Sequence, residues 1–137
     1  MSRLLDTNVW LYAFLESQDA GKRERALAVI EESNPSLSVQ IVNEICANLL
    51  RKAKLPEDQL RAIIEALYER YTVFALDGPT MLVASELRSE YRFSFWDSLI
   101  VATAWRNGVD EILSEDMNDG LIVRGAVKIT NPFREVR

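Results

Sequence analysis

Acidic side chains in separate segments of the chain are the first candidates for a functional site. Asp6 follows a short apolar segment, Asp97 lies within the apolar stretch 94–105, and Asp116 and Asp119 follow a third apolar run. Like charges held close together raise each other's pKa unless a cation neutralises them. Hard divalent ions such as Mg²⁺ or Mn²⁺ take oxygen ligands, and there they activate water for phosphodiester hydrolysis. The pattern predicts a carboxylate site that holds such an ion.

Asp97 gives the strongest signal because its neighbours on a helix are apolar. It shares one stripe with Ile100, Val101 and Ala104, where an unpaired carboxylate is energetically costly. One interpretation is a capping box, in which Ser94 is the N-cap and Asp97 occupies the third helical position. The other is a carboxylate that faces a cleft and holds a cation.

The remaining acids also have structural interpretations. Asp6 could cap the helix that follows it, and Glu44 could be a solvated acid on a polar helix face. Asp116 and Asp119 could form turns. Taken jointly, acids that follow strands ending at one sheet edge favour a shared site, because ligands of parallel sheets bind beyond the carboxyl ends of the strands.

Composition narrows the chemistry further. The 137 residues contain no histidine and a single cysteine, Cys46, which excludes histidine bases, histidine metal sites and an internal disulfide. The net charge of −5 at pH 7 argues against nucleic-acid binding through bulk positive charge, although a divalent ion would reverse the local potential. No apolar run reaches the about 20 residues of a membrane span, and the N-terminus lacks a signal-peptide pattern. We therefore expect a cytoplasmic protein.

Short apolar segments alternate with helical patterns along the chain. Strands are predicted at residues 3–5, 37–39, 72–76, 111–113 and 127–130. Helices are predicted at residues 9–15, 22–33, 40–54, from 56 onward, 81–91 and 94–105. This alternation predicts one α/β domain over residues 1–137, with a mostly parallel sheet covered on both faces. The Trp and Phe side chains lie mainly in apolar stretches and are predicted to be core.

Three motifs, in this order, resemble those of the PIN domain family. They are LLDTNV at residues 4–9, FWDSLIVATA at 95–104, and LSEDMNDG at 113–120 followed by NPF at 131–133. More narrowly, the chain resembles the VapC-type toxins of bacterial and archaeal toxin–antitoxin pairs. The resemblance implies a five-stranded parallel sheet flanked by helices on both faces, and a Mg²⁺-dependent ribonuclease.

The resemblance also implies roles for individual residues. The catalytic acids would be Asp6, Glu44, Asp97 and Asp116. The metal ligands would be Asp6, Asp97 and Asp116. Asp116 and Asp119 compete for the fourth acidic position, and we favour Asp116 because it follows Ser114 in the pattern Ser-Glu-Asp. Thr7 or Ser114 would supply a supporting hydroxyl that contacts the substrate.

Two basic residues could contact the RNA. Arg51 lies two turns beyond Glu44 on one face of the predicted helix 40–54, and Lys52 is beside it. They would either bind phosphates or form a solvated charged face, and the sequence leaves both interpretations open.

The resemblance further implies an RNA substrate, a small cognate antitoxin and a homodimer. The antitoxin could insert an Arg or Lys among the acids, or lay an amphipathic helix in an apolar groove. Two other classes stay open at this point. One is a catalytically silent PIN-like module that binds RNA or protein, and the other is a phosphatase or DNA nuclease on a related α/β fold.

Overall fold

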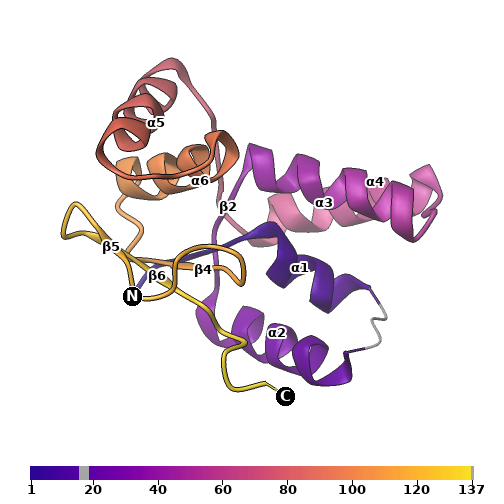
Figure 1. Ribbon diagram of the computed structural model, residues 1–137. Coiled ribbons are helices and arrows are strands. Elements are labelled where there is room, and N and C mark those ends of the chain that lie inside the picture. Colours follow the sequence, from indigo (N-terminus) through magenta and orange to yellow (C-terminus); the bar gives the residue numbers. More distant parts are fainter. Residues whose placement is uncertain (16–18, 137) are drawn as a thin grey trace.

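The apolar segments predicted as strands pair in parallel at the centre of the molecule (Figure 1). The computed structural model describes residues 1–15 and 19–136. The strands are β1 (Arg3–Leu5), β2 (Leu37–Ser38), β3 (Val73–Phe74), β4 (Glu111–Leu113), β5 (Ile122–Val123) and β6 (Val127–Thr130). They form a four-stranded sheet of order β1-β4-β6-β5 and a two-stranded sheet of β2 and β3.

The predicted five parallel strands are all present, but they are not one continuous ladder. β1 joins β2 through a single parallel bridge between Leu4 and Ser36, so the strands divide into two hydrogen-bonded groups. β5, which pairs antiparallel with β6, was not predicted from the sequence. Its two residues are too few for a periodic pattern. A tight turn with positive φ at Arg124 and Gly125 returns the chain to β6.

Apart from α4, which follows Pro56 without a side-chain cap, the helices begin where a polar side chain caps the first turn. They are α1 (Thr7–Phe14), α2 (Ala20–Ser33), α3 (Val39–Lys52), α4 (Glu57–Arg70), α5 (Gly78–Glu90) and α6 (Phe95–Arg106). The Ser38 hydroxyl accepts from the Ile41 amide at the start of α3. α5 begins at Gly78, ahead of the predicted residue 81, because the Asp77 carboxylate caps its first turn.

Helices cover both faces of the central strands, as predicted. Figure 1 shows α5 and α6 on one side of β1, β4 and β6, and α2 on the other. Consecutive residues Leu4 and Leu5 of β1 point to opposite faces, and both are fully buried, as is Ile112 of β4. Within the described ranges, no helix combines the length and apolarity needed to cross a membrane.

The prediction that the Trp and Phe side chains are core is wrong for Phe14, Phe95 and Trp96. They are 39 %, 44 % and 61 % exposed, whereas Trp10 is 1 % exposed. For Phe95 and Trp96 the reason lies in the packing of α6, where residues 98–104 are buried while the first turn projects beyond the packed layer. Hydropathy alone does not distinguish these two parts of one apolar stretch.

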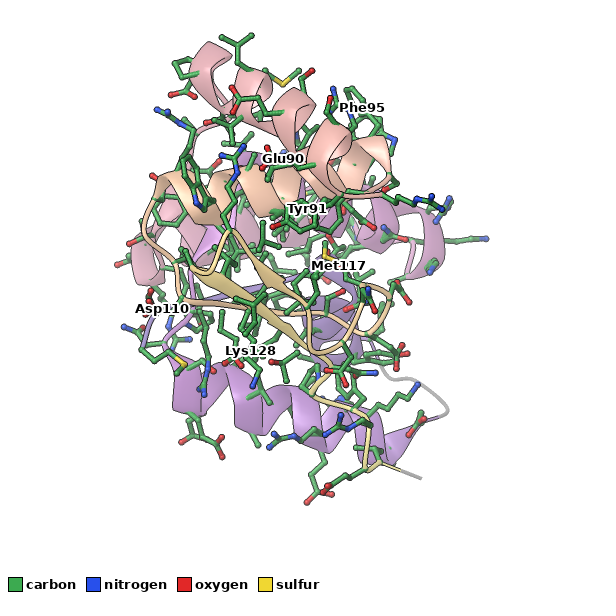
Figure 2. The ribbon with its side chains drawn as sticks, turned by 60° about the vertical axis from the view of Figure 1, so that its left-hand side comes forward. Glu90, Tyr91, Phe95, Asp110, Met117 and Lys128 are labelled. Carbon is green, nitrogen blue, oxygen red and sulfur yellow. The ribbon has the colours of Figure 1, made fainter. Side chains whose placement is uncertain are left out.

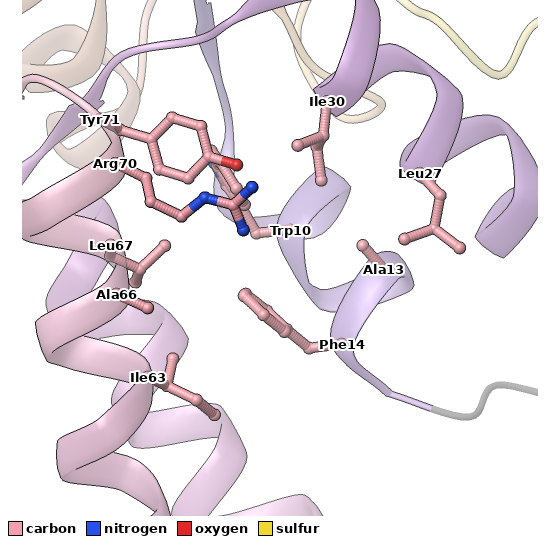
Figure 3. A pocket seen from close by; sticks show the side chains of 10 residues that line it. All are labelled: Trp10, Ala13, Phe14, Leu27, Ile30, Ile63, Ala66, Leu67, Arg70 and Tyr71. Atoms are coloured by element: carbon pink, nitrogen blue, oxygen red, sulfur yellow. The ribbon is translucent and has the colours of Figure 1, made fainter.

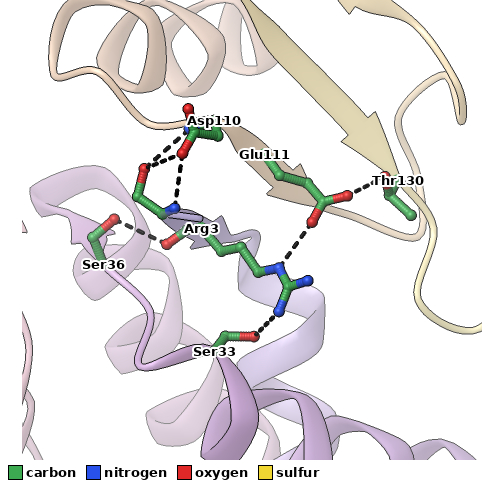
Figure 4. Close-up of polar contacts among 7 residues, drawn as sticks. Arg3, Ser33, Ser36, Asp110, Glu111 and Thr130 are labelled. Atoms are coloured by element: carbon green, nitrogen blue, oxygen red, sulfur yellow. Dashed lines mark hydrogen bonds and ion pairs between the residues drawn. The ribbon is translucent and has the colours of Figure 1, made fainter.

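A polar network joins the strands to α2 (Figure 4). Arg3 Nε donates to Glu111 Oε1 at 2.8 Å, and Arg3 Nη1 donates to Ser33 Oγ at 3.3 Å. The other oxygen of Glu111 accepts from Thr130 Oγ1 at 2.7 Å. Glu111 is 8 % exposed, so this carboxylate depends on both donors.

Replacing Arg3 with methionine should therefore destabilise the fold. We expect Arg3→Met to lower the free energy of unfolding by about 1–3 kcal/mol, because it leaves the buried Glu111 carboxylate short of a donor. Arg134→Met is the matched control, since its partner interaction with Asp119 involves a side chain that is 73 % exposed. The control should change the free energy by less than about 1 kcal/mol in urea unfolding. Equal losses in both variants would contradict this assignment.

Candidate active site

Two adjacent strands deliver the first polar residues to one edge of the sheet. β1 and β4 pair with Leu5 opposite Leu113, and the Asp6 amide donates to the Leu113 carbonyl at 2.9 Å. Asp6 and Ser114 are therefore the first residues beyond neighbouring strand ends. The Ser114 hydroxyl donates to Asp6 Oδ2 at 2.8 Å, which joins the two segments.

A cavity of about 260 Å³ at this edge brings together all four predicted acids. α1, α3, α6 and the loop after β4 supply its walls. The lining residues are Asp6, Thr7, Asn8, Leu11, Gln40, Glu44, Trp96, Asp97, Ile100 and Asp116. A second hollow of about 430 Å³ shares Asp97 and Asp116 with it and is also lined by Tyr91, Arg92 and Met117. Figure 2 places Tyr91 and Met117 between the layer of α6 and the strands.

Asp6 is the most perturbed acid of the cavity. It is 7 % exposed, and this burial raises the pKa of its carboxyl group to about 6, with smaller contributions from the charges of Asp97 and Glu44. Hydrogen bonds from Ser114 and the Thr7 amide oppose the increase. Because Asp6 accepts from the Thr7 amide, it also caps α1, so its capping interpretation is correct as well.

Each carboxylate oxygen of Glu44 accepts a hydrogen bond. Its Oε2 accepts from the Thr7 hydroxyl, and its Oε1 accepts from Gln40 Nε2 at 3.0 Å. The same Gln40 nitrogen lies 3.4 Å from the Trp96 carbonyl, which links α3 to α6. The sequence analysis missed Gln40. Its position four residues before an acid, on the same helix face, was the available signal.

Asp97 follows the predicted N-cap through its backbone and lines the cavity with its side chain. The Ser94 hydroxyl accepts from the Asp97 amide at 3.1 Å, so Ser94 caps α6. The Asp97 carboxylate lines the cavity, where burial and then the charges of Asp116 and Glu44 raise its pKa. The helix cap therefore fixes the backbone, and the side chain remains directed to the site.

Asp116 and Asp119 occupy different environments. Asp116 lines the cavity and accepts from Asn8 Nδ2 at 3.0 Å. Asp119 accepts from the Asn131 amide at 2.8 Å and pairs with Arg134 at 2.7 Å. Asp119 thus stabilises the segment after β6, and Asp116 is the acid that lies with the others.

The predicted substrate-contacting hydroxyls are engaged with protein groups. Ser114 is fully buried, and besides donating to Asp6 it accepts from the amides of Asp116 and Met117 at 3.3 Å. It therefore positions the Asp6 carboxylate from inside the protein, and its predicted contact with a substrate stays a prediction. Thr7 is 7 % exposed and holds Glu44.

Arg51 and Lys52 lie on the surface of α3, outside the residues that line the acidic cavity. Arg51 Nη2 donates to Asn48 Oδ1 at 3.0 Å on its own helix. The Asn48 amide in turn donates to the Glu44 carbonyl at 2.8 Å. A role of Arg51 and Lys52 in phosphate binding stays a prediction.

The donor atoms of the cavity fit an oxygen-liganded cation. Asn8 Oδ1 is buried and has no hydrogen-bond partner, and an oxygen in that condition is satisfied by a metal ion or by its water. Across residues 1–15 and 19–136, however, no three acidic or cysteine side chains are gathered closely enough to hold a metal ion. The carboxylates are instead bonded individually to Ser114, Thr7 and Asn8. Metal binding would require small side-chain movements.

The sequence matches the model of the PIN domain over residues 3–118, and the chain belongs to the PIN domain family. No curated protein matches the sequence.

Solved structures share the fold at low sequence identity. A toxin–antitoxin complex from Klebsiella pneumoniae aligns with a TM-score of 0.73 and 20 % identity, covering 96 % of this chain and 98 % of that chain. FitAcB from Neisseria gonorrhoeae aligns with a TM-score of 0.70 and 18 % identity, covering 96 % of this chain and 99 % of that chain. A sarcin–ricin-loop-cleaving VapC toxin of Mycobacterium tuberculosis aligns with a TM-score of 0.66 and 19 % identity, covering 81 % of this chain and 87 % of that chain.

The raised pKa of Asp6 predicts a pH-dependent stability. Its ordinary value is 3.8 and its folded value is about 6, so its contribution to stability is complete below about pH 4 and is lost as the pH rises through 6. Asp6→Asn should remove this loss. In EDTA at pH 7 we expect the variant to be more stable than wild type by up to about 3 kcal/mol, and at pH 4 the gain should vanish.

Thermal unfolding at both pH values measures this difference. Asp119→Asn is the control, since hydrogen bonds lower the pKa of the exposed Asp119 carboxyl and its removal should give no gain. A stability difference for Asp6→Asn that does not change between pH 4 and pH 7 would contradict the assignment.

Proposed function

We propose that this PIN domain is a Mg²⁺- or Mn²⁺-dependent endoribonuclease and the toxin of a cytoplasmic toxin–antitoxin pair. The observation that carries the proposal is the convergence of four acids on one cavity at the carboxyl edge of the parallel strands. Membership of the PIN domain family supports it, as do the toxin–antitoxin proteins among the structural neighbours.

The acids would have different roles, according to their surroundings in the cavity. Asp6, Asp97 and Asp116 would hold the metal, which when bound supplies an activated water and charge stabilisation for phosphodiester hydrolysis. Burial raises the pKa of Asp6 and Asp97, and this unfavourable charge makes cation binding favourable. Ser114 would keep one Asp6 oxygen fixed while the other residues bind.

Glu44 would act from the opposite wall of the cavity. Its two oxygens are oriented by the Thr7 hydroxyl and the Gln40 amide. This arrangement would hold the Glu44 carboxylate in the cavity, next to the metal ligands. Thr7 would serve as a positioning residue.

An apolar hollow of about 260 Å³ between α1, α2 and α4 supports the antitoxin part of the proposal (Figure 3). Phe14 and Leu27, which are 39 % and 44 % exposed, lie on one side of it, and Ile63 lies on the other. The Arg70 guanidinium borders this apolar surface (Figure 3). An amphipathic antitoxin helix would fit here, with an acidic residue opposite Arg70.

A homodimer is the remaining part of the proposal. Met81 and Leu82 at the start of α5 are 41 % and 68 % exposed, and this pair of apolar side chains would contact the second copy.

The catalytic proposal is tested by neutralising one acid without changing its shape. Asp97→Asn should reduce Mg²⁺-dependent cleavage of single-stranded RNA by about 100-fold or more, since it removes a charged metal ligand. Asp119→Asn is the matched control and should cleave at nearly the wild-type rate. Near-normal cleavage by Asp97→Asn would refute the metal site. Wild-type protein that binds RNA but does not cleave it with Mg²⁺ or Mn²⁺ would indicate the silent module.

The toxin proposal predicts growth arrest when the chain is expressed alone, and rescue by the adjacent gene product. Phe14→Glu should keep the arrest but lose the rescue, because it places a charge in the apolar hollow. Tyr68→Glu, on α4 outside the hollow and at a side chain that is 51 % exposed, should keep both. Harmless expression of folded wild-type protein would count against the toxin, and rescue of Phe14→Glu would count against this docking surface.

A further inference from the structure

Two aromatic side chains at the start of α6 are exposed beside the acidic cavity. Trp96 is 61 % exposed and Phe95 is 44 % exposed, although aromatic side chains of this size usually contribute to a core. Their rings meet edge to face, with centroids 5.1 Å apart at 83°. The buried part of α6 begins at Ser98, so neither ring belongs to the buried core.

Trp96 is part of the wall of the cavity itself. It lines the same 260 Å³ space as the four acids and immediately precedes Asp97. The Gln40 amide that orients Glu44 also lies 3.4 Å from the Trp96 carbonyl. The exposed indole is therefore attached to the same rigid frame as the carboxylates.

The neighbouring Phe95 is held by contacts from Arg88 on α5. The guanidinium carbon of Arg88 lies 4.9 Å from the centre of the Phe95 ring. Arg88 Nη1 donates to Ser98 Oγ at 2.7 Å, and Ser98 Oγ donates to the Phe95 carbonyl at 2.6 Å. An aromatic surface held in this way loses little conformational entropy when a planar ligand binds against it.

The negative charge of the site limits which part of an RNA can bind to this aromatic surface. The protein carries a net charge of −5, and the cavity contains four acids, so RNA phosphates are repelled except where a metal is bound. The bases are the uncharged part of the substrate. In single-stranded RNA they are free to stack on aromatic side chains, whereas in a duplex they are not.

We propose that Trp96 is a base-stacking residue for the unpaired nucleotide next to the scissile phosphate, supported by Phe95. This inference rests on the proposed ribonuclease function and assigns the base next to the scissile phosphate to one residue of this chain. A second copy of the chain is the alternative occupant of this aromatic surface, and the experiment separates the two.

The test is a double-mutant cycle between the protein and its RNA. The cleavage site in a single-stranded oligoribonucleotide is first mapped with wild-type protein and Mg²⁺. Trp96→Ala should then lower kcat/KM by about 5- to 150-fold, and Trp96→Phe should restore most of the loss. With an abasic nucleotide beside the scissile bond, Trp96→Ala should cause little further loss. Tyr68→Ala, which removes an equally exposed aromatic ring on α4, should cleave like wild type.

Several outcomes overturn the inference without affecting the proposed function. These are wild-type cleavage by Trp96→Ala, an equal loss on the intact and the abasic RNA, and dissociation of a wild-type dimer on substitution of Trp96 in sedimentation experiments. The last outcome assigns the surface to a second copy. Absence of RNA cleavage by wild-type protein with Mg²⁺ or Mn²⁺ refutes the proposed function, and the inference with it.

Discussion

The placement of several carboxylates in one partly buried cavity is the constraint on which the rest of the structure depends. Asp6 is almost fully buried, and this burial disfavours its charged form and raises its pKa to about 6. The fold compensates by giving the acids separate donors, with Ser114 on Asp6, Thr7 on Glu44 and an asparagine amide on Asp116. Such a cavity destabilises an empty site and favours a bound cation.

α6 carries both an acid of the cavity, Asp97, and the proposed base-stacking residue, Trp96. Residues 98–104 are buried against α5 and the strands, so the helix is fixed in position. Its capped first turn then presents Asp97 to the cavity and leaves Trp96 at the rim. One rigid helix thus sets the position of an acid and of an aromatic surface, and the distance between them cannot vary independently.

The sequence predicted the features that depend on patterns extending over many residues. The apolar stripe of residues 40–54 and the buried strands gave the parallel α/β fold, and strand ends gave the edge where the acids meet. It did not predict that Ser114 is buried, because that depends on how the loop after β4 packs. It also missed Gln40 and the exposure of Trp96, since a hydropathy pattern does not reveal which apolar residues have neighbours to cover them.

That these acids form a divalent-metal site can be tested by anomalous diffraction from crystals grown with Mn²⁺. We expect one strong manganese peak in the cavity, bound to carboxylate oxygens of Asp6, Asp97 and Asp116 either directly, at about 2.1 Å, or through a water molecule. The same crystals of Asp97→Asn should lose most of that peak. A well-ordered cavity without manganese, or an ion bound elsewhere such as at Asp119, would contradict the account.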